Sequence, residues 1–466
     1  MACGSFLHFL RKSLKLNPSF LKVCFLQYKQ IIKETEEEKG ETFMKILLTT
    51  DWYQPVVNGV ITSMVNLKRE LEERGHEVRV LTLSRTYHSY KENEIYYVKS
   101  INLERIYPNV RAVLPHREKM IEEIICWKPD IVHSQCEFMT FSYAVKISKK
   151  CGCPLLHTYH TIYEDYLHYF PGNLAKYRAG AELERKIVAG FSRYVLGKTD
   201  QVIVPTEKVE KILEKYQVEE PVSVIPSGIE LSAFQVRLTK EEKQRRREEL
   251  GIPENHKVLV SIGRLAKEKN LEEILHYFAQ MKKEEDKIHM SLLVVGDGPD
   301  RERLEQITKE LDLTKYVIFT GMVAPEKVPE YYQLGDVFVC ASNSETQGIT
   351  YIEAMASGLP ALCRKDDCLK QVITDGYNGF QYENYEYFRM HLDYILEQEE
   401  RRAQMGYCAA QTAKLYSTWN FCTMAERLYK EVLVRQAREH AGNAQAASNW
   451  GMSFGWSRRN MLRRGV

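Results

Sequence analysis

The sequence predicts an α/β protein with two doubly wound domains, each built on a parallel sheet covered by helices. The chain has 466 residues, whereas a single core stops growing efficiently near ~250–300 residues. From Met44 onward, short apolar runs alternate with amphipathic helical stretches, a pattern typical of buried parallel sheets. A stretch rich in Lys, Arg and Glu interrupts this alternation as far as Glu249, and the alternation then resumes.

The first domain is predicted over residues 44–226. Apolar runs predict its strands, and apolar residues spaced three or four apart predict its helices. A strand and turn at Val222–Ile229 mark the hinge to the next domain. The predicted strands are Lys45–Thr50, Val78–Leu83, Ile131–His133, Leu155–Thr158 and Gln201–Val204, and the predicted helices are Ile61–Arg74, Phe141–Lys150 and Lys176–Leu196.

The second domain is predicted over residues 227–400. Helical periodicity then continues from about Tyr385 to near Glu439, with an interruption at Tyr416–Asn420. Ligands of doubly wound sheets bind beyond the carboxyl ends of the strands, so the active site is expected between the domains. The predicted strands are Val258–Ile262, Leu292–Val295, Val317–Phe319 and Val337–Cys340.

The composition excludes several classes of protein. The chain has 65 Lys and Arg against 63 Asp and Glu, and this net charge of +2 does not indicate nucleic-acid binding. Its 11 cysteines form no zinc-ligand pattern, and reduced thiols in a cytoplasm are expected. No run reaches the ~18–20 apolar residues needed to cross a bilayer, so membrane contact is predicted only at the surface.

The two ends of the chain differ from the middle. Residues 1–43 form an extension whose first part is basic and apolar. It is either an amphipathic arm for an anionic surface or a translated upstream region, with the native start at Met44. Residues 441–466 form a basic tail with aromatic residues, which either meets lipid headgroups or is disordered.

The segment Ser342–Pro360 carries the strongest functional signal. It follows a predicted strand, and a helix is predicted to open near Ile349. Gly348, Ile349 and Thr350 would therefore direct free N–H groups and the positive end of the helix dipole at a phosphate. An anionic ligand is predicted to bind here.

A second signal follows the first strand of the second domain. Arg264 offers a planar fork of donors and Lys269 a point charge, which together suit a diphosphate leaving group without a metal ion. In the first domain, Gly59 opens a predicted helix where a backbone can approach an anion closely. There is no Gly-x-Gly-x-x-Gly fingerprint and no Asp-x-Asp at a strand end, so neither a dinucleotide cofactor nor a metal is predicted.

Two carboxylates flank the anion-binding turn. Glu345 is predicted in the loop and Glu353 on the helix. Ionised carboxylates only accept hydrogen bonds, which suits sugar and ribose hydroxyls. A paired-carboxylate glycosidase is the alternative, but it leaves Arg264 and Lys269 without a phosphate to bind.

Two histidines, His157 and His160, lie at the carboxyl end of a predicted strand in the first domain. No cysteine or carboxylate completes a metal-ligand pattern beside them, so a zinc site is not predicted. Their position favours contact with a ligand, whereas a lone histidine is more often structural.

Together these motifs resemble glycosyltransferase family 4, whose members are retaining enzymes with two facing Rossmann-like domains (the GT-B architecture). The resemblance covers about 44–433. It rests on the paired-Glu segment ending in Gly358-Leu-Pro, on Gly-Arg264-Leu followed by Lys269, and on Trp419 before a final helix. It implies that helices of 401–440 return to the first domain.

The resemblance also implies how the donor is held. Arg264 and Lys269 correspond to the residues that grip the donor diphosphate, and Gly59 to the glycine that meets it from the first domain. Thr350 lies at the phosphate end, beside Gly348 and Ile349. The donor is expected to be a UDP-sugar, with no cofactor required.

The same resemblance assigns the sugar end of the donor. Glu345 corresponds to the residue that contacts the hexose hydroxyls, Glu353 to the one that holds the ribose, and His160 to the one near the reacting sugar. The candidate catalytic residues are therefore His160, Glu345, Arg264 and Lys269.

The acceptor follows from a narrower likeness. The stretches Pro129–Phe138 and His157–Tyr169 are similar to bacterial diacylglycerol glucosyltransferases of this family, and Asp165 and Tyr166 are candidate acceptor-site residues. This likeness implies transfer of glucose from UDP-glucose to diacylglycerol, by a cytoplasmic enzyme on the inner face of the cell membrane. The basic, apolar stretch Lys176–Leu196 suits an anionic lipid surface, or it is an ordinary amphipathic helix.

Two other functions are compatible with these motifs. A transferase of the same family with a soluble or polysaccharide acceptor would share the donor site. A non-catalytic sugar-nucleotide binding protein would keep the fold without needing Arg264, Lys269, Glu345 and Glu353 together. The sequence does not distinguish glucose from galactose in the donor.

Overall fold

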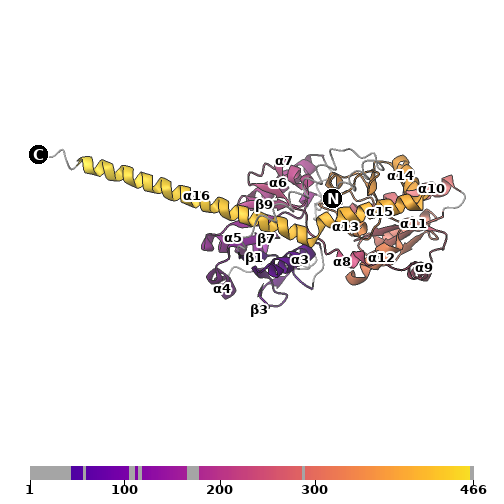
Figure 1. Cartoon of the computed structure of the whole chain (residues 1–466), viewed down its shortest axis with the longest axis horizontal. Coiled ribbons are helices and arrows are strands. Elements are labelled where there is room, and N and C mark those ends of the chain that lie inside the picture. The colour runs from indigo at the N-terminus through magenta and orange to yellow at the C-terminus, as the bar shows by residue number, and fades with distance from the viewer. Residues whose placement is uncertain are drawn as a thin grey trace, which may run out of the picture. The chain divides into compact units, whose positions relative to one another are not determined.

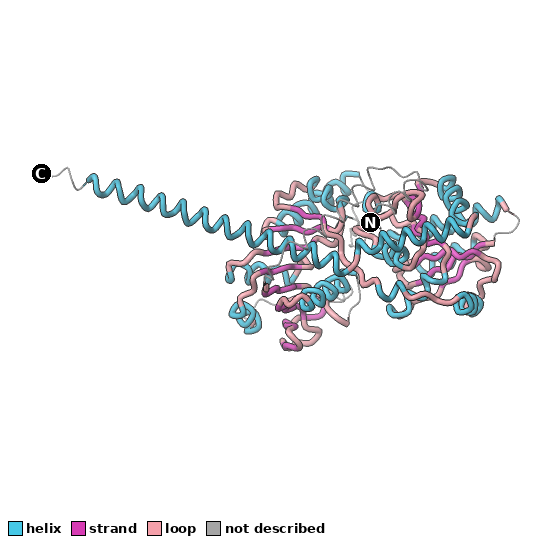
Figure 2. Tube along the Cα trace, in the orientation of Figure 1, coloured by secondary structure: helices cyan, strands magenta, loops and turns pink. Residues whose placement is uncertain are grey.

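The structure, a computed structural model, describes residues 43–55, 59–103, 111–113, 118–164, 178–285 and 289–461, with the backbone alone for 178–181, 184 and 442–461. Contacts group Met1–Met44 into one unit and Lys45–Val466 into another. The second unit contains two large sheets flanked by helices, which Figure 2 shows by secondary structure. The predicted α/β class with two doubly wound domains is confirmed. The predictions for residues 1–42 lie outside the described residues.

The first sheet contains, within the described residues, eight strands in the order β10-β9-β8-β7-β1-β2-β4-β3. Neighbouring strands are parallel except for β3 and β4. The strands are β1 (Lys45–Thr49), β2 (Glu77–Leu83), β3 (Tyr90–Glu92), β4 (Ile95–Val98), β7 (Ile131–Ser134), β8 (Leu155–Thr158), β9 (Gln201–Val204) and β10 (Val222–Val224); β5 (Ile101–Asn102) and β6 (Arg111–Ala112) form a separate antiparallel pair. The accompanying helices are α3 (Gly59–Glu73), α4 (Lys119–Trp127), α5 (Met139–Cys151), α6 (Arg178–Leu196) and α7 (Glu207–Lys215).

The second sheet has the order β13-β12-β11-β14-β15-β16 and is parallel throughout its described pairs. Its strands are β11 (Lys257–Ile262), β12 (Met290–Val295), β13 (Val317–Phe319), β14 (Val337–Cys340), β15 (Ala361–Arg364) and β16 (Gly379–Tyr382). Its helices are α8 (Ser232–Gln235), α9 (Lys240–Glu249), α10 (Leu271–Glu284), α11 (Arg301–Glu310), α12 (Val328–Leu334), α13 (Ile349–Ala356), α14 (Tyr385–Glu397) and α15 (Glu399–Ala413), with short 3₁₀ turns η3 (Lys267–Lys269), η4 (Pro325–Lys327), η5 (Asp367–Leu369) and η6 (Lys414–Tyr416).

Alternating side chains of the second sheet enter two separate cores. Val258 and Val260 of β11 pack on one face with residues of α12 and α13. Leu259, between them, packs on the opposite face with residues of α10 and α14. Because side chains alternate across a strand, near-continuous apolar strands need a cover on both faces. This arrangement fixes the strands rigidly and positions the loops at their ends.

The strand order reverses once in each sheet, between β1 and β7 in the first and between β11 and β14 in the second. Connections leave such a pair of strands in opposite directions, and ligands bind beyond the carboxyl ends there. Gln135 follows β7 in the first sheet, and Arg264 and Glu345 follow β11 and β14 in the second. The motifs therefore stand at the reversal points, a placement that depends on the strand order.

The last helix, α16 (Thr418–Met461), returns to the first sheet (Figure 1). It contacts α3, and the Arg74 guanidinium donates to the Glu426 carboxylate at 3.0 Å and to the Trp419 carbonyl at 2.9 Å. The predicted return of the C-terminal helix is confirmed. Its backbone continues to Met461, beyond the predicted end near Glu439, because the alanines after Glu439 favour helix. In the described part of the chain, every helix is too short or too polar to span a bilayer.

Candidate active site

The loop between β14 and α13 is the predicted anion-binding turn. Gly348 has φ +76° and caps α13. A Cβ at this position would lie 2.6 Å from the Tyr351 ring, so the turn requires glycine. Within the described residues, the N–H groups of Gly348, Ile349 and Thr350 have no acceptor, as expected for the first turn of a helix. The predicted anion site therefore has the backbone geometry that it needs.

Glu345 and Lys269 come together at this turn. The Lys269 Nζ donates to Glu345 Oε1 at 2.7 Å. Glu345 is buried, with 8% of its surface exposed, while the Lys269 side chain is 32% exposed. The 3₁₀ turn η3 after β11 supplies Lys269, and the loop after β14 supplies Glu345. Two segments distant in sequence thus place a cation and a carboxylate side by side.

Arg264 lies apart from this pair. Its Nη2 donates to the Glu268 carboxylate, and its side chain is 47% exposed. The Glu268 side chain is only 7% exposed, whereas the guanidinium remains accessible, so an incoming anion can compete with Glu268 for Arg264. The structure does not bring Arg264 onto the Glu345 carboxylate.

Glu353 occupies a different environment, on α13. Its Oε2 accepts a hydrogen bond of 2.9 Å from the Tyr332 hydroxyl. Burial raises the pKa of the Glu353 carboxyl to about 7, since the hydrogen bond from Tyr332 offsets only part of the desolvation. Glu353 is therefore close to half ionised at neutral pH, in contrast to an exposed glutamate.

Helix α7 and the segment after β10 contact the anion-binding turn directly. The Gln347 amide exchanges two hydrogen bonds with the Ser227 backbone, at 2.8 and 2.9 Å. Lys208 of α7 donates to the Glu345 carbonyl at 3.0 Å and to Asp366 at 2.8 Å. The sequence motifs gave no signal for Lys208 or Gln347, because their role depends on long-range contacts.

Gly59 of α3 also approaches the turn. A Cβ on Gly59 would lie 3.0 Å from Ile349 Cδ1. The first helix of the first sheet therefore begins close to the first residue of α13. The motif residue Asn58 before it lies outside the described residues.

His160 belongs to a chain of buried hydrogen bonds in the first sheet. Its Nε2 lies 2.8 Å from Gln135 Oε1, and Gln135 Nε2 lies 3.0 Å from His133 Nε2. His133 Nδ1 in turn lies 2.7 Å from the Tyr429 hydroxyl of α16. Burial lowers the pKa of His133 to about 3 and that of His160 to about 4, so both are neutral at pH 7.

This chain fixes the tautomer of each histidine. The amide nitrogen of Gln135 only donates, so His133 Nε2 accepts and His133 Nδ1 carries the proton. The amide oxygen of Gln135 only accepts, so His160 carries its proton on Nε2. The lone pair of His160 Nδ1, which no described residue contacts by a hydrogen bond, is then available to a ligand hydroxyl.

The second predicted histidine, His157, is buried in a cluster with Glu137. His157 Nε2 lies 3.3 Å from Glu137 Oε1, and the Tyr163 hydroxyl donates to Glu137 Oε2 at 2.7 Å. Burial would raise the pKa of Glu137, but the contacts with His157 and Tyr163 outweigh it and hold that pKa below its usual value. This cluster supports the strand ends beside His160. The candidates Asp165 and Tyr166 lie outside the described residues.

The two parallel sheets and the loops at their carboxyl ends are those expected of a two-domain transferase. Residues 57–233 match the family "Glycosyltransferase Family 4", and residues 242–412 match "Glycosyl transferases group 1". An alpha-monoglucosyldiacylglycerol synthase of Streptococcus pneumoniae is 38% identical over 73% of this chain and 75% of its own length. A second protein of that name, from Acholeplasma laidlawii, is 30% identical over 84% of this chain and 98% of its own length.

Solved structures agree on the fold. Anabaena HepE in complex with UDP and glucose superposes with a TM-score of 0.58 at 17% identity, over 83% of this chain and all of that one. Sucrose-phosphate synthase from Thermosynechococcus elongatus superposes with a TM-score of 0.63 at 18% identity, over 84% of this chain and 100% of that one. The chain belongs to glycosyltransferase family 4 and is a hexosyltransferase with the GT-B fold.

Proposed function

We propose that this protein transfers glucose from UDP-glucose to diacylglycerol, with retention of configuration, at a membrane surface. The observation that carries the proposal is the identity to two relatives named alpha-monoglucosyldiacylglycerol synthase, one of which the chain spans over 98% of its length. The anion-binding turn with Lys269 and Glu345 supports the donor half of the proposal. The product is a glycolipid.

The donor diphosphate binds at the anion-binding turn. The N–H groups of Gly348, Ile349 and Thr350 donate to it, and the Lys269 ammonium and Arg264 guanidinium add positive charge. Arg264 exchanges Glu268 for the phosphate as the donor arrives. The groups are already in place before reaction, so they stabilise the charge that develops on the leaving phosphate.

The transfer step needs no covalent enzyme intermediate. The bond from the sugar carbon to the phosphate oxygen breaks while the acceptor hydroxyl bonds to the same face of that carbon. The proton of the acceptor hydroxyl passes to the departing phosphate oxygen. His160, neutral at pH 7, accepts a hydrogen bond from a sugar hydroxyl at Nδ1, and Glu345 accepts another, so the enzyme mainly supplies position.

The surface of α6 supports attachment to a membrane. Leu183, Ile187 and Phe191 are spaced four apart on one helix face and are 50%, 60% and 36% exposed, and Tyr194 is 67% exposed. Basic residues alone do not explain this surface, because Arg185 lies 3.5 Å from Glu164 and Lys186 lies 3.3 Å from Glu182. An exposed apolar face with charged flanks suits the boundary between headgroups and acyl chains.

The donor assay uses radiolabelled UDP-glucose and UDP-galactose with diacylglycerol in mixed micelles. We expect labelled monoglucosyl lipid from UDP-glucose and its loss in Arg264→Gln and Glu345→Gln. Arg245→Gln is the matched control, because Arg245 also pairs with a glutamate four residues later and is 67% exposed. Full transfer to a soluble sugar with none to lipid would support the polysaccharide alternative, and a full-rate Glu345→Gln enzyme would refute the role of Glu345.

The membrane assay measures sedimentation with vesicles that contain anionic lipid. Leu183→Ser with Ile187→Ser should reduce the bound fraction, whereas Val236→Ser, at an apolar side chain that is 69% exposed elsewhere, should not. Equal binding of both variants would contradict attachment through α6.

We also expect transfer to survive a metal chelator, and complete loss of turnover with the chelator would contradict a metal-free mechanism.

A further inference from the structure

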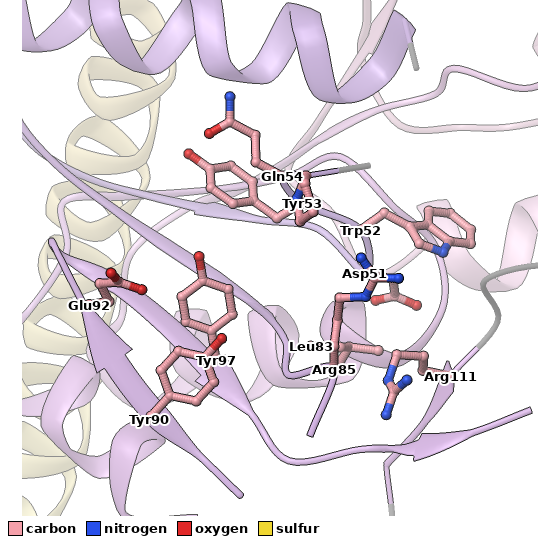
Figure 3. A pocket seen from close by; sticks show the side chains of 11 residues that line it. Asp51, Trp52, Tyr53, Gln54, Leu83, Arg85, Tyr90, Glu92, Tyr97 and Arg111 are labelled. Carbon is pink, nitrogen blue, oxygen red and sulfur yellow. The ribbon is translucent and has the colours of Figure 1, made fainter. Parts of the chain in front are cut away.

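A pocket of about 250 Å³ opens at the carboxyl ends of β1, β2 and β4, on the same edge of the first sheet as His160 (Figure 3). The turn after β1, from Asp51 to Pro55, forms one wall, and Gly59 follows it closely in sequence. Ligands of doubly wound sheets bind at this edge. None of the donor-site residues lines the pocket.

The pocket has two chemically different ends, which Figure 3 shows. Arg85 and Arg111 lie at one end. At the other, the rings of Tyr90 and Tyr97 are stacked with their centroids 4.4 Å apart, and Tyr90 is 39% exposed. One end therefore offers hydrogen-bond donors, and the other an apolar ring surface.

The arginines have no carboxylate partner within the described residues. Arg111 donates from Nε to the Ser100 hydroxyl at 2.6 Å and from Nη2 to the Ser100 carbonyl at 3.1 Å, which fixes the guanidinium without neutralising it. The exposed Arg85 makes no hydrogen bond or ion pair with any described residue. Both guanidiniums are thus available to acceptor oxygens.

The nearest acid, Asp51, is already occupied. Its carboxylate accepts hydrogen bonds from Met139 N at 2.9 Å, Thr140 N at 2.7 Å and Thr140 Oγ1 at 2.6 Å. It caps the start of α5 and so serves the fold. Glu92 lies near the tyrosines, at the other end of the pocket from the arginines.

We propose that this pocket binds the glycerol diester of the lipid acceptor, with Arg85 and Arg111 donating to its two ester carbonyls and the Tyr90–Tyr97 pair packing on the first acyl carbons. The inference rests on the proposed lipid acceptor and names the part of the chain that selects it. An ester carbonyl only accepts hydrogen bonds, so unpaired guanidiniums suit it. At about 250 Å³ the pocket is smaller than the ~300–1,000 Å³ that encloses a drug-sized ligand, so it takes the glycerol end and leaves the acyl chains outside.

The test crosses a change in the lipid with a change in the protein. Wild-type enzyme and Arg85→Gln are assayed with diacylglycerol and with the dialkyl ether analogue, in which weakly accepting ether oxygens replace the ester carbonyls. The wild-type kcat/KM should favour the diester by about a hundredfold, because each of the two charge-assisted hydrogen bonds is worth about tenfold. Arg85→Gln should raise KM for the diester and lose about tenfold of this preference, since Arg111 still donates to the other carbonyl. Lys99→Gln, which changes an exposed cation outside the pocket, should keep it.

The outcomes separate this inference from the proposed function. If wild-type enzyme transfers no sugar to diacylglycerol, the lipid acceptor itself is wrong. If transfer occurs and Arg85→Gln keeps both the KM and the diester preference of the wild type, the pocket does not bind the glycerol. If glycerol 3-phosphate inhibits the wild type competitively and Arg85→Gln abolishes that inhibition without changing the diester preference, the arginines bind a phosphate instead. UDP affinity, measured by calorimetry, should be equal in all three proteins, and its loss in Arg85→Gln would also overturn the assignment.

Discussion

Replacing Glu353 with glutamine should stabilise the folded protein at alkaline pH and lower its affinity for UDP. The carboxyl has a pKa of about 7 in the folded chain against 4.5 for an ordinary glutamate. A carboxyl whose pKa rises on folding holds its proton more tightly when folded, so the folded state loses stability as pH increases between the two values. The neutral amide of Glu353→Gln carries no such cost, and its oxygen still accepts from Tyr332.

The magnitude follows from the two pKa values. The interval of about 2.5 pH units corresponds to about 3 kcal/mol of stability once the pH is well above 7. Integration gives a difference between variant and wild type of about 1 kcal/mol at pH 5 and about 3 kcal/mol at pH 8. The gap should therefore widen by about 2 kcal/mol between these two pH values.

Urea unfolding at pH 5, 6, 7 and 8 measures this gap. Glu397→Gln serves as the control, because the Glu397 side chain is 68% exposed. If Glu353 holds the ribose, as the family resemblance implies, its ionised carboxylate accepts from the ribose hydroxyls. The UDP affinity of the wild type should then increase as pH passes through 7, and the variant should lack this increase. Parallel stability curves for wild type and Glu353→Gln would refute the raised pKa, and an unchanged UDP titration would refute contact with the ribose.

Three further substitutions test the rest of the site. Gln135→Glu should raise the pKa of His160 from about 4, because it adds a negative charge beside the ring. The kcat of this variant should therefore fall on acidification from pH 7 to 5, whereas the kcat of the wild type should stay constant. A constant kcat in both proteins would contradict the hydrogen bond between Gln135 and His160. Gly348→Ala should weaken UDP binding at least about fivefold, equal to about 1 kcal/mol of strain, because the added Cβ meets Tyr351 at a positive φ; calorimetry would contradict this with an unchanged Kd. Lys208→Met should raise the donor KM by about fivefold to tenfold by releasing the Glu345 loop, with a smaller change in kcat; a change confined to kcat would argue against this positioning role.

The apolar runs of the sequence predicted the buried strands closely, because strands covered on both faces are mostly apolar. Strands β8, β9, β13 and β14 have the predicted bounds. Strands β4, β15 and β16 were not predicted. Gln381 interrupts β16 and Arg364 ends β15, whereas β4 is a four-residue apolar run between polar segments. The strand order is set by pairing between distant segments, so local pattern does not contain it.

In the candidate site, too, only the locally determined features were predictable. The anion-binding turn was predictable because a local sequence, Gly348 before a helix, determines its backbone. Partners of the charged groups were not predictable, and Lys269 pairs with Glu345 while Arg264 pairs with Glu268. Which cation meets which carboxylate depends on how the loops after β11 and β14 pack, and on competition with the donor phosphates.

The chain of hydrogen bonds behind His160 depends entirely on packing between distant segments. Each of its members is an ordinary polar residue in the sequence, and its chemistry arises only when β7, β8 and α16 pack together. Tyr429 lies 2.7 Å from His133 Nδ1, so the position of the returning helix is transmitted through Gln135 to the tautomer of His160. The return of α16 to the first sheet therefore does more than cover apolar surface, because it supports the chain of hydrogen bonds that orients His160.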